Sequence, residues 1–107
     1  MDRWVTVGLV PELQPGTCRS VDIGDLSVAL CNVDGRIYAL DNVCPHAGGP
    51  LGEGTVVGDH VECPWHGWRY NVRTGERPEN PDFKVPTYRV QLEGNNIQIF
   101  VPGTKTD

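Results

Sequence analysis

The chain has 107 residues, of which 38% are hydrophobic and 21% charged, and its 9 basic and 14 acidic side chains give a formal net charge of −5. This is the composition of an ordinary globular protein, and its length suits one domain, so we expect residues 1–107 to fold as a single domain. The negative charge argues against nucleic acid and anionic membrane surfaces as partners, because both would repel it.

The expected location of the protein follows from what the sequence lacks. No segment approaches the roughly 20 consecutive apolar residues that cross a bilayer, and the amino terminus has no apolar core of a signal peptide. We therefore expect a cytoplasmic protein without a membrane partner. In the reducing cytosol its four cysteines are expected to be metal ligands or free thiols rather than disulfides.

Almost the whole chain has the sequence pattern of β-strands. Its 13 glycines and 9 prolines indicate many turns, and no helical spacing of apolar residues runs without a glycine or proline, so no long helix is expected. Turn sequences predict hairpins at Gly24-Asp25, Asp34-Gly35, Gly58-Asp59 and Glu93-Gly94-Asn95. The predicted strands span residues 4–8, 18–23, 26–33, 36–42, 56–57, 60–63, 68–72, 85–92 and 96–101, whereas 43–55 and 77–86 lack a strand pattern.

The turn at Gly24-Asp25 also predicts which residues of its hairpin face each other. If Ile23 opposes Leu26, the numbers of opposed residues sum to 49, and Cys18 lies opposite Cys31. Counted outward from the turn, this is a pair without hydrogen bonds of its own, where side chains approach most closely. We expect two reduced thiols that are cross-strand neighbours, on the less apolar face of the hairpin and away from any metal ligands.

Cysteine and histidine recur together as two short pairs in the middle of the chain. The sequence reads CPH from Cys44 to His46 and, after sixteen further residues, CPWH from Cys63 to His66. A predicted hairpin, 56–63, separates the pairs, and its antiparallel strands would bring them back together. Two thiolates and two imidazoles suit a transition-metal site.

A structural zinc site is the alternative, because four cysteine and histidine ligands hold zinc in many small domains. Zinc fingers, however, usually pair cysteine with cysteine and histidine with histidine, at other spacings. The pattern therefore favours an iron–sulfur cluster over zinc, and zinc over the absence of a metal.

The segments CPHAGGPLGEG, which begins at Cys44, and CPWHGWRYNVRTGE, which begins at Cys63, resemble the Rieske iron–sulfur family. That resemblance implies an all-β fold, with an antiparallel β-sandwich or barrel base, an inserted cluster-binding lobe at about residues 43–70, and one [2Fe–2S] cluster. It gives Cys44 and Cys63 to the inner iron and His46 and His66 to the outer iron. Two thiolates leave the oxidised site formally neutral where four would leave a dianion, so its potential exceeds that of plant-type ferredoxins.

The resemblance also bears on how the potential is tuned. Tyr70 stands where high-potential members have a tyrosine that hydrogen-bonds a cysteine sulfur of the cluster. Those members carry a disulfide at the positions of Gly49 and Trp65, and a serine at the position of Trp68. Because this chain lacks both devices, we expect a potential near the lower end of the Rieske range, about −150 mV.

The remaining polar and aromatic residues near the motifs have ordinary interpretations. We expect Trp65 and Trp68 to shield the cluster loops, the prolines of residues 78–86 to stiffen a cover over them, and His60 to be a solvated turn residue. Four acidic side chains could surround the cluster end, for docking or for solubility alone: Glu53, Asp59, Glu62 and Asp82.

Two functions are consistent with a single Rieske-type cluster, and the family resemblance supplies the partners of both. The first is a ferredoxin that passes electrons from an NAD(P)H-dependent flavoprotein reductase to a terminal oxygenase. The second is the small subunit of an NAD(P)H-dependent nitrite reductase, bound to its large subunit; a purely structural subunit is the third possibility. Oxygen activation by the chain alone is not expected, because that chemistry needs a second iron site, and two of the 3 histidines are already assigned.

Overall fold

The computed structural model describes residues 3–44, 48–65 and 67–101 of the chain. Two of the predicted ligands, His46 and His66, lie outside these described residues. Within them the regular elements are β-strands and two three-residue 3-10 helices, η1 (Val10–Glu12) and η2 (Leu51–Glu53). None of the helices described is long and apolar enough to cross a membrane. The prediction of an all-β protein is confirmed.

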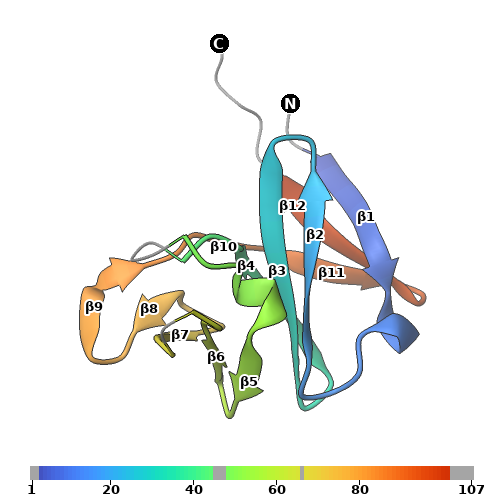
Figure 1. The fold of residues 1–107 in the computed structure, drawn as a ribbon. Helices are drawn as coiled ribbons and strands as arrows, with labels where there is room; N and C mark the ends of the chain where they lie inside the picture. The colour runs from blue at the N-terminus through green and yellow to red at the C-terminus, as the bar shows by residue number, and fades with distance from the viewer. Residues whose placement is uncertain (1–2, 45–47, 66, 102–107) are drawn as a thin grey trace.

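The described strands form antiparallel sheets (Figure 1). The first sheet joins the two ends of the chain and has the order β1 (Arg3–Leu9), β12 (Asn96–Val101), β11 (Val90–Glu93). The second has the order β10 (Thr87–Tyr88), β4 (Arg36–Asp41), β3 (Leu26–Val33), β2 (Cys18–Ile23). The third is β5 (Thr55–Val57), β6 (His60–Glu62), β7 (Arg69–Asn71), and the fourth is the hairpin β8 (Glu76–Arg77), β9 (Asn80–Lys84). The first two sheets form a base, and the last two extend from it as a lobe, at the left of Figure 1.

Short turn sequences place the hairpins where they were predicted. The residue pairs that close three of the turns are Ile23 with Leu26, Val33 with Arg36, and Val57 with His60. Asp34 and Gly35 both have positive φ, 53° and 93°, as a two-residue turn needs if it is to follow the twist of its strands. The fourth turn is one residue shorter than predicted, because Glu93 already pairs with Asn96.

The predicted strand at residues 85–92 is wrong, because the chain changes sheets within it. Tyr88 of β10 pairs with Ala39 in the second sheet, whereas Val90 of β11 pairs with Ile99 in the first. One continuous strand cannot hydrogen-bond in both sheets. The sequence alternates apolar and polar residues through this crossing, so the pattern alone does not reveal it.

The interpretation of residues 77–86 as lacking strands is also wrong, since β8 and β9 form a hairpin there. Most residues of β9 are exposed, so the segment has no apolar alternation, and its Pro81 is a residue that central strands avoid. The expected contact with the segment that follows the predicted ligand Cys63 is present, however. The ring of Phe83 meets that of Trp68 edge to face, with centroids 5.5 Å apart.

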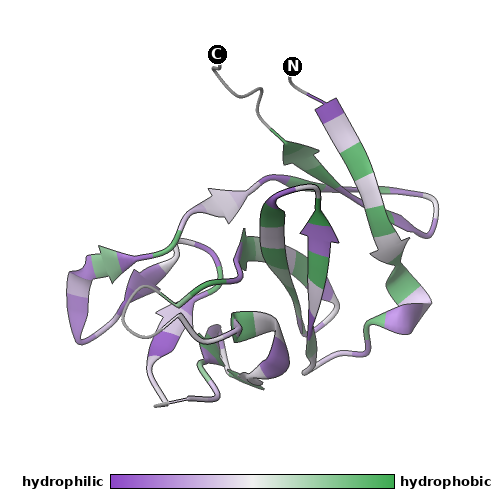
Figure 2. Ribbon diagram, turned by 45° about the horizontal axis from the view of Figure 1, so that its top comes forward, coloured by the Kyte–Doolittle hydropathy of each residue, from purple (hydrophilic) through white to green (hydrophobic). Residues whose placement is uncertain are grey.

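The two faces of the second sheet pack against different cores, because successive residues of a strand point to opposite sides. One core, between the two sheets of the base, contains Leu13, Val28, Leu30, Ala39, Ile97 and Ile99. The other, between the base and the lobe, contains Ala29, Cys31, Leu40, Cys44, Leu51, Val61, Cys63, Tyr70, Val72 and Val85. The banding of apolar and polar residues along the base strands is visible in Figure 2.

The predicted pairing of Cys18 with Cys31 is confirmed, and every pair along β2 and β3 has the predicted register. Both cysteines are free thiols. The expectation that they lie away from the predicted metal ligands is wrong. Cys31 belongs to the same core as Cys44 and Cys63, because that face of β3 is turned toward the lobe.

Candidate metal centre

The two predicted cysteine ligands lie at the ends of strands and point into one core. Cys44 follows β4 and is 0% exposed, and Cys63 follows β6 and is 1% exposed. Both side chains belong to the core between base and lobe. The hairpin of β5 and β6 connects the two segments, as the spacing of the motifs predicts.

The first cysteine is held by two backbone hydrogen bonds to residues just beyond it. The N–H of Cys44 donates to the carbonyl of Gly49 at 2.9 Å, and the N–H of Gly48 donates to the carbonyl of Cys44 at 2.7 Å. Gly48 has a φ of 76°, in the left-handed region that favours glycine. Glycine at this position therefore favours the closure.

The second cysteine is held by the same pair of bonds. The N–H of Cys63 donates to the carbonyl of Trp68 at 2.7 Å, and the N–H of Gly67 donates to the carbonyl of Cys63 at 3.0 Å. Gly67 has a φ of 74°, close to that of Gly48. Two segments distant in sequence thus present a buried cysteine in the same backbone setting.

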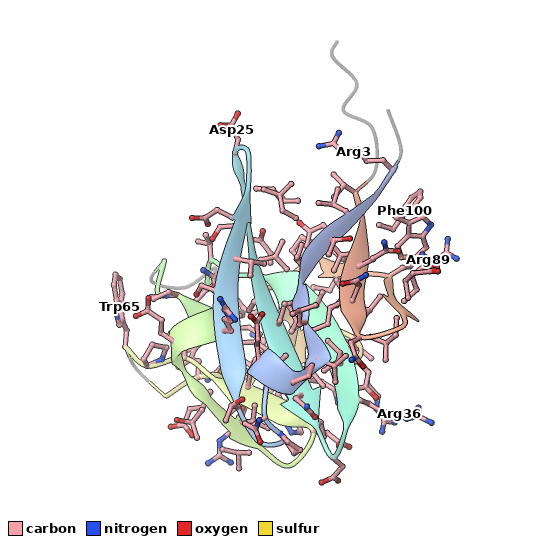
Figure 3. The ribbon with its side chains drawn as sticks, turned by 90° about the vertical axis from the view of Figure 1, so that its right-hand side faces the viewer. Arg3, Asp25, Arg36, Trp65, Arg89 and Phe100 are labelled. Atoms are coloured by element: carbon pink, nitrogen blue, oxygen red, sulfur yellow. The ribbon has the colours of Figure 1, made fainter. Side chains whose placement is uncertain are left out.

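The two loops approach each other at Gly49. A Cβ atom on Gly49 would lie 2.8 Å from Sγ of Cys63 and 3.0 Å from Cγ of Trp65, which is closer than side chains normally pack. The first loop therefore passes directly over the sulfur of the second. The indole of Trp65 therefore lies directly beside Gly49. Figure 3 shows this side chain projecting outward from the lobe, and the residue is 56% exposed.

A second close approach sets the spacing of the loops at their base. Gly54 immediately precedes β5, and a Cβ atom on it would overlap the carbonyl oxygen of Glu62. Thr55 pairs across the hairpin with Glu62, the residue that directly precedes Cys63. The absence of a side chain at Gly54 thus allows the segment after the first loop to lie against the segment before the second.

Tyr70 contacts one of the two sulfurs, as the family resemblance implies. It comes from β7, is fully buried, and places its hydroxyl oxygen 3.2 Å from Sγ of Cys44. Burial, and then the contact with Cys44, raise the pKa of the phenol, so it stays protonated at neutral pH. Toward a thiolate at Cys44, the hydroxyl can only donate.

Asn42 anchors the first loop to the base, a role that sequence reasoning missed. Its Oδ1 accepts a hydrogen bond from the N–H of Gly52 at 2.6 Å, and its Nδ2 donates to the hydroxyls of Ser20 and Ser27 at 3.1 and 3.0 Å. The asparagine is buried, and its own carbonyl accepts the N–H of Leu51 at 2.7 Å. Its partners come from three other segments, so no local pattern could have identified it.

Arg77 is the second residue that sequence reasoning missed. Its guanidinium carbon lies 3.6 Å from the centroid of the Trp68 ring, and its side chain is 19% exposed. With Phe83 at the edge of the same ring, Trp68 is held from two sides. Glu79 Oε1 lies 3.8 Å from Nε of Arg77. These contacts support the expected packing role of Trp68 next to the second loop.

The third histidine and the four acidic residues named in the sequence analysis lie at half-buried or exposed positions. His60 is half-buried in β6, opposite Val57 and Asn71, rather than in the turn itself. Of the acidic residues, Glu62 is half-buried and lies 3.4 Å from Arg69. Exposed positions are occupied by Glu53, Asp59 and Asp82.

The donor set of the described residues fits the sulfur end of a metal cluster. Cys44 and Cys63 supply two buried, soft ligands, Gly49 allows the backbone to approach, and Tyr70 can donate to a ligand sulfur. Among the residues outside 45–47, 66 and the two termini, no group of three or more metal-binding side chains occurs.

Comparisons with known proteins agree with this chemistry. A sequence model of the Rieske [2Fe–2S] domain matches residues 3–89. Ferredoxin CarAc of Metapseudomonas resinovorans is 36% identical over 103 residues, which cover 95% of each chain.

Solved structures show the same similarity. A chain in the complex of reduced oxygenase and oxidized ferredoxin in carbazole 1,9a-dioxygenase is 34% identical, with a TM-score of 0.79 over 90% of this chain and 91% of that one. An NADH-dependent nitrite reductase small subunit from Mycobacterium tuberculosis is 25% identical, with a TM-score of 0.88 over 97% of this chain and 99% of that one.

Proposed function

The chain belongs to the Rieske [2Fe–2S] family and carries one such cluster, and we propose that it is a ferredoxin-type electron carrier. It passes single electrons from an NAD(P)H-dependent flavoprotein reductase to a terminal oxygenase and is not catalytic alone. Similarity to a ferredoxin over 95% of both chains supports this function, as does similarity to a chain of an oxygenase–ferredoxin complex.

The four ligands we propose are Cys44 and Cys63 on one iron and His46 and His66 on the other. The observation that carries this assignment is the matched setting of the two cysteines, each buried and each closed by the same two backbone bonds. When bound, the cluster accepts and releases one electron. The chain itself contributes two features. The hydroxyl of Tyr70 is a hydrogen-bond donor held at the sulfur of Cys44, and the loop contact at Gly49 excludes water from Cys63.

The proposed organisation is one domain over residues 1–107, with a cluster-binding lobe at about residues 43–70, in the cytosol. The pairing of β1 with β12 in one sheet supports the single domain. Cys18 and Cys31 face each other across the strands as free thiols, which supports a reducing compartment.

Electron delivery can be measured by mixing the reduced protein with candidate acceptors under anaerobic conditions in a stopped-flow instrument. We expect a terminal oxygenase to reoxidise the cluster within its turnover time. Reoxidation by a large nitrite reductase subunit, with no reaction at the oxygenase, would instead establish the second function. The TM-score of 0.88 to a nitrite reductase small subunit is the observation that favours this alternative.

The metal content separates a cluster from zinc. Purified protein should be brown and contain about two irons and two acid-labile sulfides per chain, and dithionite should bleach it. Metal analysis and a labile-sulfide assay on the same sample check this. Stoichiometric zinc without labile sulfide would rule out the cluster.

Replacing Tyr70 by phenylalanine should lower the reduction potential. In wild type, the hydrogen bond from Tyr70 to Cys44 stabilises the more negative, reduced site more than the oxidised one, and the variant loses this bond. A difference of about 1 kcal/mol between the two states corresponds to roughly 40 mV for one electron. Tyr88→Phe is the matched control, because that hydroxyl bonds to Asp41 instead. An equal shift in both variants would contradict a specific role for Tyr70.

A further inference from the structure

Cys18 and Cys31 have the geometry of a dithiol that can close to a disulfide. They are directly opposed in the register of β2 and β3. The N–H of Asn32 donates to the carbonyl of Thr17 at 3.0 Å, so the pair next to the two cysteines is hydrogen-bonded and their own pair is not. At such positions Cα atoms lie about 4.5 Å apart. That separation is within the range of about 4.4–6.8 Å over which disulfides form, at its short end.

The two thiols differ in their access to solvent. Cys31 is fully buried, whereas Cys18 is half-buried at the start of β2. The hydrogen bond between them lowers the pKa of Cys18 and raises that of Cys31. Of these two thiols, a reagent in solution can therefore reach only Cys18. Cys18 also forms the thiolate more readily, because its pKa is the lower of the two.

The accessible sulfur contacts the segment that links the first metal-binding loop to β5. Sγ of Cys18 lies 3.1 Å from the carbonyl oxygen of Gly54 and 3.6 Å from that of Leu51. These residues flank or belong to η2, which follows the loop of Cys44. A chemical change at Cys18 would thus alter a contact of the lobe.

We propose that Cys18 and Cys31 form a thiol–disulfide exchange site, separate from the cluster, that reacts with low-molecular-weight disulfides such as oxidised glutathione. The thiolate of Cys18 attacks one sulfur of the reagent, forms a mixed disulfide and releases one glutathione thiolate. Cys31 loses its proton and attacks the sulfur of Cys18, forms the cross-strand disulfide and releases the second glutathione. The protein loses two electrons and two protons, and one oxidised glutathione becomes two thiols.

The short separation of a pair without hydrogen bonds implies a strained disulfide, which thiols reduce readily. The site is therefore reversible, reduced in an ordinary cytosol and oxidised when the disulfide pool rises.

The experiment uses the holoprotein, incubated anaerobically with oxidised glutathione, then quenched in acid, alkylated and mapped by mass spectrometry. Wild type should give a Cys18–Cys31 disulfide while the visible spectrum of the cluster is retained. Cys31→Ser should stop at a glutathione adduct on Cys18. Cys18→Ser, and Cys18→Ala as a second variant, should react at least about tenfold more slowly, because the remaining thiols are buried.

Three results would overturn the proposal. The first is a wild-type protein that keeps its cluster and forms no Cys18–Cys31 disulfide. The second is an adduct on Cys18 in wild type that Cys31 never resolves. The third is loss of the cluster from wild type and from Cys18→Ser at the same rate, which would show that the reagent attacks Cys44 or Cys63 instead.

Discussion

Replacing His66 by cysteine should lower the reduction potential by on the order of 100 mV, because a thiolate adds a negative charge where a neutral imidazole stood. Rieske sites begin near −150 mV and all-cysteine plant-type sites lie near −400 mV, so one replacement should cover about half of that interval. His46→Cys should have a similar effect. A spectroelectrochemical titration of any variant that retains its cluster measures the shift.

The third histidine of the chain is the control for this experiment. His60 lies in β6, paired with Val57 and Asn71, and has no assigned metal. His60→Cys adds the same side chain and should leave the potential nearly unchanged. If all three variants shifted equally, the ligand assignment would be wrong.

Replacing Gly54 by alanine should destabilise the holoprotein by about 3 kcal/mol, the upper range for inserting a methyl group into a packed site. The added Cβ would overlap the carbonyl oxygen of Glu62, and a backbone atom cannot rotate away. In a chain of about 100 residues this corresponds to a fall of roughly 15 °C in apparent melting temperature. Iron content should fall as well, because this contact brings the segments that carry Cys44 and Cys63 together.

Gly58→Ala gives the matched control at the other end of the same hairpin. Gly58 has a φ of 60°, and a Cβ atom there would meet nothing within 4 Å. Gly58→Ala should lower the free energy of unfolding by only about 1 kcal/mol, because alanine is strained in the left-handed backbone conformation. The iron content should stay unchanged. Equal losses of stability and iron in the two variants would show that the close approach at Gly54 does not position the loops.

Much of the fold could be predicted because its turns are local. Two-residue turns such as Gly24-Asp25 determine register as well as position, since each residue outward has one partner. That is why the pairing of Cys18 with Cys31 could be derived by counting from the turn. The contact of Tyr70 with the sulfur of Cys44 followed instead from the family resemblance.

The errors lie where long-range contacts override local pattern. The change of sheets between Tyr88 and Val90 depends on two separate strand partners, Ala39 and Ile99, which no local window contains. The hairpin of β8 and β9 is exposed, so no apolar alternation marked its strands.

The side chains that support the site were missed for the same reason. Asn42 bonds to three segments, and Arg77 stacks on Trp68. Neither contact has a sequence signature, because the partners meet only in the folded chain.

Pulsed EPR of the reduced protein tests the proposed ligand set most directly, when the protein is produced with nitrogen-15-labelled histidine. The one-electron-reduced cluster has an unpaired spin, which couples strongly to nitrogen atoms bound to iron. We expect two strongly coupled nitrogens, from His46 and His66, and no change in that number in His60→Ala. A reduced cluster that couples to no histidine nitrogen, or that loses a coupling in His60→Ala, would contradict the assignment.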